Sequence, residues 1–206
     1  MEGLRRTQRP RGQWSVCVCV VLSAVTVTTA AQAMKVRAVE LDDMVAQADR
    51  IFVGTCVEAR SEMDVKHGIV STLYAFTVSR PIKGNLGLTL TFRQYGGQVA
   101  KRRTVVHGLP AYAPGQEVVL FLHPDSDWGL TSPVGIFQGC YAVITEGDGR
   151  RVVLNSPYAQ HLSGEELSRT ARALSKPARL TTEGRMELGD FVALVDGMVK
   201  DGEQAK

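Results

Sequence analysis

Short runs of apolar, β-branched and aromatic residues, separated by turn residues, fill the middle of this 206-residue chain. Each run has the length and composition typical of a β-strand. The runs cover residues 51–57, 69–78, 86–92, 117–122, 139–145 and 151–154. A polar loop at 61–68, Pro81, Gly96-Gly97 and Pro124 are expected to end them. This spacing predicts a mainly β protein, a small antiparallel barrel, closed or partly open, or a sandwich.

Helical periodicity occurs only near the two ends of this β-rich region. Leu41, Met44, Val45 and Ala48 are spaced as on one face of a short amphipathic helix. Past residue 160, the segment 163–176 and the segment around 188–198 each predict a helix, the first ended by a proline and the second packing against the barrel. The expected organisation is therefore a leader at 1–33, a β-barrel domain at 34–158 and a helical C-terminal extension at 159–206.

The first 33 residues have the pattern of a secretory signal. A basic stretch precedes the uncharged run 16–27, and Ala31-Gln32-Ala33 has the form of a cleavage site. We expect cleavage after Ala33 and a secreted or periplasmic protein. The alternative is an uncut membrane anchor, because 14–33 holds 20 uncharged residues, about the length of a bilayer span.

The net charge of the chain depends on whether the leader is counted. The whole chain has a formal charge of +3, but residues 1–33 contain four arginines and one acid. The remaining residues hold 20 basic and 20 acidic side chains. A balanced chain lacks the electrostatic attraction that nucleic acids require, and it is drawn to a membrane only if the leader is retained.

Two cysteines, Cys56 and Cys140, remain after the leader. An oxidising compartment favours a disulfide between them, and the single pair leaves no cysteine unmatched. The alternative is two buried free thiols in neighbouring strands.

Residues with catalytic or ligand-binding chemistry are sparse. The four histidines are widely spaced and lack metal-motif spacing, and neither a nucleophile elbow nor a phosphate loop is present. We therefore expect a protein without cofactor or metal that is not an enzyme. Lys101, Arg102 and Arg103 form the one basic cluster, within the irregular stretch 98–115. Long irregular loops on a barrel are often functional, so the face around residues 93–115 is the expected contact surface and these three residues are candidate contacts to a partner. The alternative is a solvated loop, which the lack of neighbouring aromatic residues and of net positive charge favours.

Two patches of sequence resemble the netrin-like modules, which include the tissue inhibitors of metalloproteinases. The first is Ala48-Asp49 followed by the strand Ile51-Phe52-Val53-Gly54, and the second is Tyr74-x-Phe76 followed by Lys83-Gly84. The similarity spans about residues 41–97 and extends to exported bacterial proteins of unassigned role. It implies a five-stranded OB-type barrel.

The resemblance does not carry the inhibitory activity with it. The inhibitors clamp the protease zinc with an N-terminal cysteine, whereas this chain after cleavage would begin Met34-Lys35 and have no cysteine before Cys56. The dense disulfide scaffold of that family is also missing. The sequence thus favours an exported, non-enzymatic binding or envelope protein with an unknown protein or envelope partner. A metalloprotease inhibitor and a metal-dependent hydrolase with a dispersed site are the alternatives.

Overall fold

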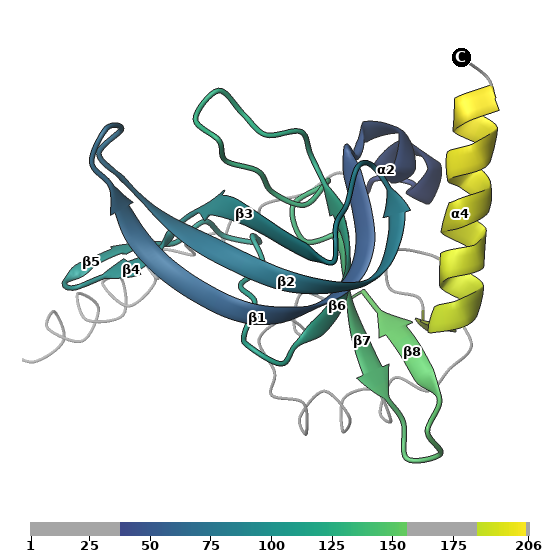
Figure 1. Ribbon diagram of the computed structural model, residues 1–206. Coiled ribbons are helices and arrows are strands. Elements are labelled where there is room, and N and C mark those ends of the chain that lie inside the picture. The colour runs from purple at the N-terminus through teal and green to yellow at the C-terminus, as the bar shows by residue number, and fades with distance from the viewer. Residues whose placement is uncertain (1–37, 156–184, 205–206) are drawn as a thin grey trace, which may run out of the picture. The chain divides into compact units, whose positions relative to one another are not determined.

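The computed structural model describes residues 38–155 and 185–204, which belong to one compact unit, Val36–Lys206 (Figure 1). The predicted leader at 1–33 and the helix expected at 163–176 lie outside the described residues.

Seven strands form one antiparallel sheet in the order β3-β2-β1-β6-β7-β8-β9. Their bounds are β1 Arg50–Asp64, β2 Ile69–Lys83, β3 Thr89–Tyr95, β6 Glu117–Leu122, β7 Cys140–Thr145, β8 Arg151–Leu154 and β9 Arg185–Glu187. The sheet is not closed, because β3 and β9 are its two edges. The prediction of a mainly β, antiparallel fold is confirmed. The sequence left open whether the sheet closes into a barrel, and in the structure the sheet is open.

The β1–β2 hairpin is longer than the sequence indicates. β1 continues through the expected loop to Asp64, so that only residues 65–68 form the turn. β2 likewise continues through Pro81. A proline fits there because β2 has no β3 neighbour beyond Thr77, and because a register shift lies beside the Phe52–Pro81 pair. Such irregularities bend strands, and both strands are visibly curved (Figure 1).

The first part of β1, up to Cys56, and the whole of β6 are buried on both faces, which explains the unbroken apolar run of β6. Val118, Leu120 and Leu122 point into one core, and Val119 and Phe121 point into the other. We call the first the aromatic core; it comprises Phe52, Cys56, Tyr74, Phe76, Val78, Phe92, Tyr112, Val118, Leu120, Leu122 and Cys140. Alternation of side chains across a strand supplies both cores from one segment.

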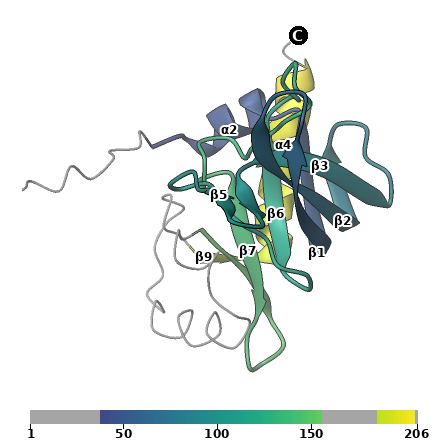
Figure 2. The ribbon, with the colours of Figure 1, turned by 90° about the vertical axis from the view of Figure 1, so that its left-hand side faces the viewer.

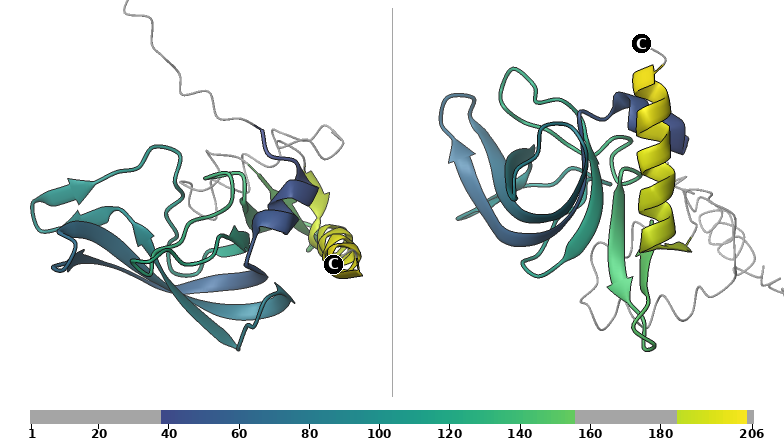
Figure 3. Two further views of the ribbon diagram at one scale, coloured as in Figure 1. Left: turned by 90° about the horizontal axis from the view of Figure 1, so that it is seen from above. Right: turned by 45° about the vertical axis from the view of Figure 1, so that its right-hand side comes forward.

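The second core, here the helix-side core, lies between the sheet and two helices, α2 (Leu41–Gln47) and α4 (Leu188–Gln204) (Figure 3). Met44 and Val45 come from α2, and Phe191 and Val195 come from α4. The expected short N-terminal helix and the C-terminal helix are therefore confirmed. Within the two described ranges, no helix is long and apolar enough to cross a bilayer.

Residues 97–104 form a small hairpin, β4 (Gly97–Val99) and β5 (Arg102–Thr104), where the sequence predicts only irregular structure. Each strand has three residues and the second is polar, so neither has the apolar alternation that indicates a strand. Figure 2 looks from the side on which this hairpin lies, away from α4.

The segment after β6 crosses back toward the β3 edge. Leu122 forms an isolated bridge with Pro133, and Leu130 forms another with Arg93 of β3. The Thr131 amide also donates to the Arg93 carbonyl over 2.8 Å. Short bridges from one irregular segment thus cover part of an edge that would otherwise be exposed.

Candidate functional site

The three basic residues expected to contact a partner are brought together on the β4–β5 hairpin. Lys101 lies in the turn, Arg102 and Arg103 lie on β5, and all three side chains are exposed. Neighbouring residues of a strand point to opposite sides. Arg102 lies against the Met63 sulfur of β1, 3.7 Å from its Nη1, whereas Arg103 lines a cavity beneath the hairpin.

This hairpin cavity has a volume of about 350 Å³ and lies between the hairpin, the sheet and the loop at 105–111. Thr72, Tyr74 and Gln94 contribute the wall on the sheet side. The loop side is apolar and includes Val105 and Leu109. Arg103 is the one charged residue in the lining, and none of the ion pairs among the described residues involves it.

Two glycines bring the hairpin close enough to β1 and β2 to form this cavity. Gly96 and Gly97 have φ angles of +102° and +132°, a region that residues with a Cβ rarely adopt. A Cβ at Gly97 would lie 2.4 Å from the hydroxyl oxygens of Ser61 and Thr72. The sequence predicts that this pair ends a strand, and the structure adds the close approach.

Gln94 is the buried polar residue of the cavity and is 4% exposed. Its Nε2 donates to the Pro110 carbonyl over 2.6 Å, while its Oε1 has no hydrogen-bond partner among the described residues. A buried acceptor without a donor costs on the order of 1–3 kcal/mol. The lining of the cavity therefore contains one buried acceptor without a hydrogen-bond donor and one positively charged side chain.

A ring of aromatic side chains supports the floor of the cavity. The Tyr74 and Tyr112 rings meet edge to face with centroids 4.8 Å apart, and Phe92 lies 5.7 Å from Tyr74. Burial raises the pKa of the Tyr74 hydroxyl, so that it stays neutral. These aromatic residues hold the sheet side of the cavity in place and carry no charge.

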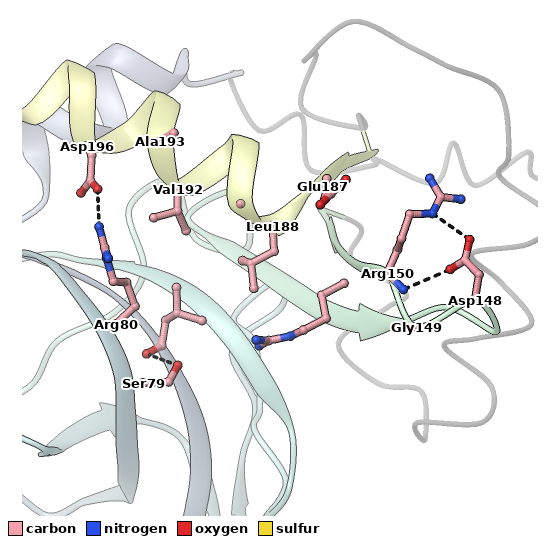
Figure 4. A pocket seen from close by; sticks show the side chains of 13 residues that line it. Ser79, Arg80, Asp148, Gly149, Arg150, Glu187, Leu188, Val192, Ala193 and Asp196 are labelled. Atoms are coloured by element: carbon pink, nitrogen blue, oxygen red, sulfur yellow. Dashed lines mark hydrogen bonds and ion pairs between the residues drawn. The ribbon is translucent and has the colours of Figure 1, made fainter.

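A second opening, the helix cleft, has a volume of about 790 Å³ and lies where α4 faces β2 and the β7–β8 turn (Figure 4). Leu188 and Val192 of α4 form part of its apolar surface. Its charged groups lie on both sides of this surface, on α4 and on the strands.

The three arginines that line the helix cleft are already paired with acids. Arg80 Nη2 lies 2.8 Å from the Asp196 carboxylate, and Arg150 Nε lies 2.7 Å from that of Asp148 (Figure 4). Arg151 pairs with Glu117. Hydrogen bonds from Arg150 lower the pKa of Asp148. An anionic ligand would have to displace one of these acids, so the hairpin cavity is the better candidate site for an anion.

Cys56 of β1 and Cys140 of β7 both lie in the aromatic core, with β6 between their strands. In the structure no disulfide joins them, and both are buried. Burial raises the pKa of each thiol, so neither is activated as a nucleophile. A bond between them stays a prediction from the sequence.

The histidines of the described residues do not assemble into a site. His67 Nδ1 is hydrogen-bonded to the Asp64 carboxylate, 2.9 Å from Oδ2, and the His67 ring stacks on Trp128 with ring centroids 4.6 Å apart. His107 and His123 line neither cavity. In the part of the chain that the structure describes, no group of three or more His, Cys, Asp or Glu side chains could hold a metal ion. His161 lies outside that part.

Neither a protein-family model nor a curated protein matches this sequence. Sequence reasoning found Lys101, Arg102 and Arg103 but missed Gln94, because nothing in the residues around it indicates that its amide would be buried. The absence of any acid from 93–115 was the available signal that this stretch favours an anion.

Proposed function

We propose that this chain is an exported, non-enzymatic binding protein whose binding face consists of the β4–β5 hairpin and the loop at 105–115. The observation that carries the proposal is the hairpin cavity, which combines the unpaired Arg103 with the buried, unpartnered Oε1 of Gln94. Val105 beside it is 57% exposed, although the aromatic core is close by. Exposed apolar and charged groups around one cavity are typical of binding sites.

We further propose that the fold is of the OB or netrin-like type. The bridges from the 130–133 segment to β3 and β6 support it, because they complete a ring of contacts through β1 and β2. The two motifs of the resemblance also meet in space. Lys83 donates to the Ala48 carbonyl over 2.6 Å, and Gly84 packs directly on the Asp49 carbonyl.

A site-specific photo-crosslinker at Val105 tests the binding face. We expect it to capture a component of an envelope extract, and the paired reversal Arg102→Glu and Arg103→Glu to abolish the capture. The matched control is the same crosslinker at Leu88, which is 85% exposed at the opposite end of β3. Equal capture from Leu88, or capture that survives the charge reversal, would contradict the proposal.

A further inference from the structure

We propose that the hairpin cavity binds small monocarboxylates that also carry an N–H or O–H donor and a short apolar group. The inference rests on the proposed function and names the ligand class for the same site. Three properties of the lining lead to it: one unpaired cation, one unpartnered buried acceptor and an apolar wall.

The charge of the lining selects an anion. Among the described residues of the lining, Arg103 is the one ionised side chain, and no Asp or Glu is present. A guanidinium binds a carboxylate through two parallel hydrogen bonds, a geometry that a lysine cannot reproduce. Because only one positive charge is available in a largely apolar cavity, a monoanion is matched better than a doubly charged phosphate.

Gln94 adds the requirement for a donor. Its Nε2 is held by the Pro110 carbonyl over 2.6 Å, which fixes the amide orientation and leaves Oε1 as the free atom. Oε1 itself is buried, so a ligand N–H or O–H reaches it only when the surrounding side chains shift. That hydrogen bond removes the cost of the unpaired acceptor, whereas a ligand without a donor leaves it in place. The amide therefore discriminates between otherwise similar acids.

The size and the apolar wall limit the rest of the ligand. A volume of about 350 Å³ is at the small end of ligand cavities, and fits a molecule of amino-acid size. Val105 and Val106 are 57% and 36% exposed and line the cavity. An aliphatic group against them would remove apolar surface from water on both partners.

Calorimetric titration of the purified chain with three related probes tests the ligand class. N-acetyl-L-leucine carries the carboxylate, the donor and the apolar group. N-acetyl-L-leucinamide lacks the carboxylate, and 4-methylpentanoate lacks the donor. We expect N-acetyl-L-leucine to bind and the other two to bind at least tenfold more weakly. Absence of binding, or an amide that binds as well as the acid, would overturn the inference.

Two variants connect the binding to the named residues. Arg103→Gln should weaken N-acetyl-L-leucine at least tenfold. The matched control is Arg60→Gln, at an exposed arginine of β1 that lines neither cavity, and it should leave the binding unchanged. Gln94→Met should remove the preference for N-acetyl-L-leucine over 4-methylpentanoate. Since this change could also weaken the fold, the ratio of the two affinities is measured together with the unfolding transition. Equal effects at Arg60 and Arg103 would contradict the assignment.

These outcomes are distinct from those of the crosslinking experiment. If the acids fail to bind while Val105 still captures a component in an Arg102- and Arg103-dependent way, the ligand class is wrong and the binding face stands. If both experiments fail, the face itself is wrong.

Discussion

Lys83 and Gly84 show how two short motifs far apart in sequence become one structural unit. The Lys83 ammonium donates to the carbonyls of Val45 and Ala48, both over 2.6 Å, where α2 ends. These carbonyls lack partners inside the helix, and a cation stabilises that end. Gly84, at φ +88°, then turns against the carbonyl of Asp49. The motifs resembling the netrin-like modules thus fix how α2 joins the sheet.

We predict that Gly84→Ala lowers the free energy of unfolding by about 2–4 kcal/mol, measured by urea denaturation. A Cβ there would lie 2.6 Å from the Asp49 carbonyl oxygen, in a backbone conformation that residues with a side chain avoid. Gly68→Ala is the control, because Gly68 has a φ of +67° but open space around it. It should cost only about 1 kcal/mol. Equal losses would show that the close contact is unimportant.

Asp64 at the tip of the β1–β2 hairpin makes a residue-scale prediction about pH. The side chain and amide of His67 both hydrogen-bond its carboxylate, and these bonds lower the pKa of Asp64. A carboxyl with a depressed native pKa stabilises the fold above its unfolded pKa and loses that contribution as pH falls through the native value.

Asp64→Asn should therefore reduce stability at pH 7, and its difference from the unmodified chain should shrink below about pH 4. Urea denaturation from pH 2 to 8 measures this. Asp127→Asn, whose exposed carboxylate takes part in none of the described ion pairs, is the control. A difference for Asp64→Asn that is constant over the whole range would refute the linkage.

At the scale of elements, segments with a strong local pattern were predictable. The run at 117–122 is β6 residue for residue, and the helix around 188–198 lies within α4. The β4–β5 hairpin was not predictable, since its strands hold three residues each and are fixed by Gly96-Gly97 rather than by apolar alternation. The site was likewise predictable only in part. Arg103 could be found because it belongs to a basic cluster in the sequence, whereas Gln94 matters because the fold buries it, which no local pattern shows.

The thiols of Cys56 and Cys140 give a prediction about strands β1 and β7. Since burial raises the pKa of both, we expect neither to react with iodoacetamide in the native chain at pH 8. Mass spectrometry after unfolding without reductant should show alkylation at both Cys56 and Cys140 if no disulfide joins them, as in the structure. If instead no site is alkylated until a reductant is added, the disulfide expected from the sequence has formed. Rapid alkylation of the native chain would contradict the burial of both residues.

At the scale of the whole molecule, β1 and β6 join two cores that depend on each other. Because β6 and the first part of β1 contribute side chains to both cores, loosening the helix-side core also releases the strands that carry the aromatic core. The hairpin cavity is built on the aromatic core through Tyr74. The C-terminal helix, although far from the cavity along the chain, therefore contributes to the stability of the surface that we propose binds ligand.

Phe191→Ala tests this dependence. Phe191 is fully buried, with its ring centroid 4.6 Å from that of Tyr141 and 6.3 Å from that of Phe121. Its removal should cost about 3–5 kcal/mol. Leu194→Ala, on the half-buried side of α4, is the control and should cost about 1 kcal/mol.

The number of unfolding transitions shows whether the sheet depends on α4. If the β-domain and the C-terminal extension were independent, Phe191→Ala would leave the unfolding of the sheet unchanged and unfold the helix alone. We expect instead one transition at lower urea by both far-ultraviolet circular dichroism and tryptophan fluorescence, because α4 completes a core on which the sheet depends.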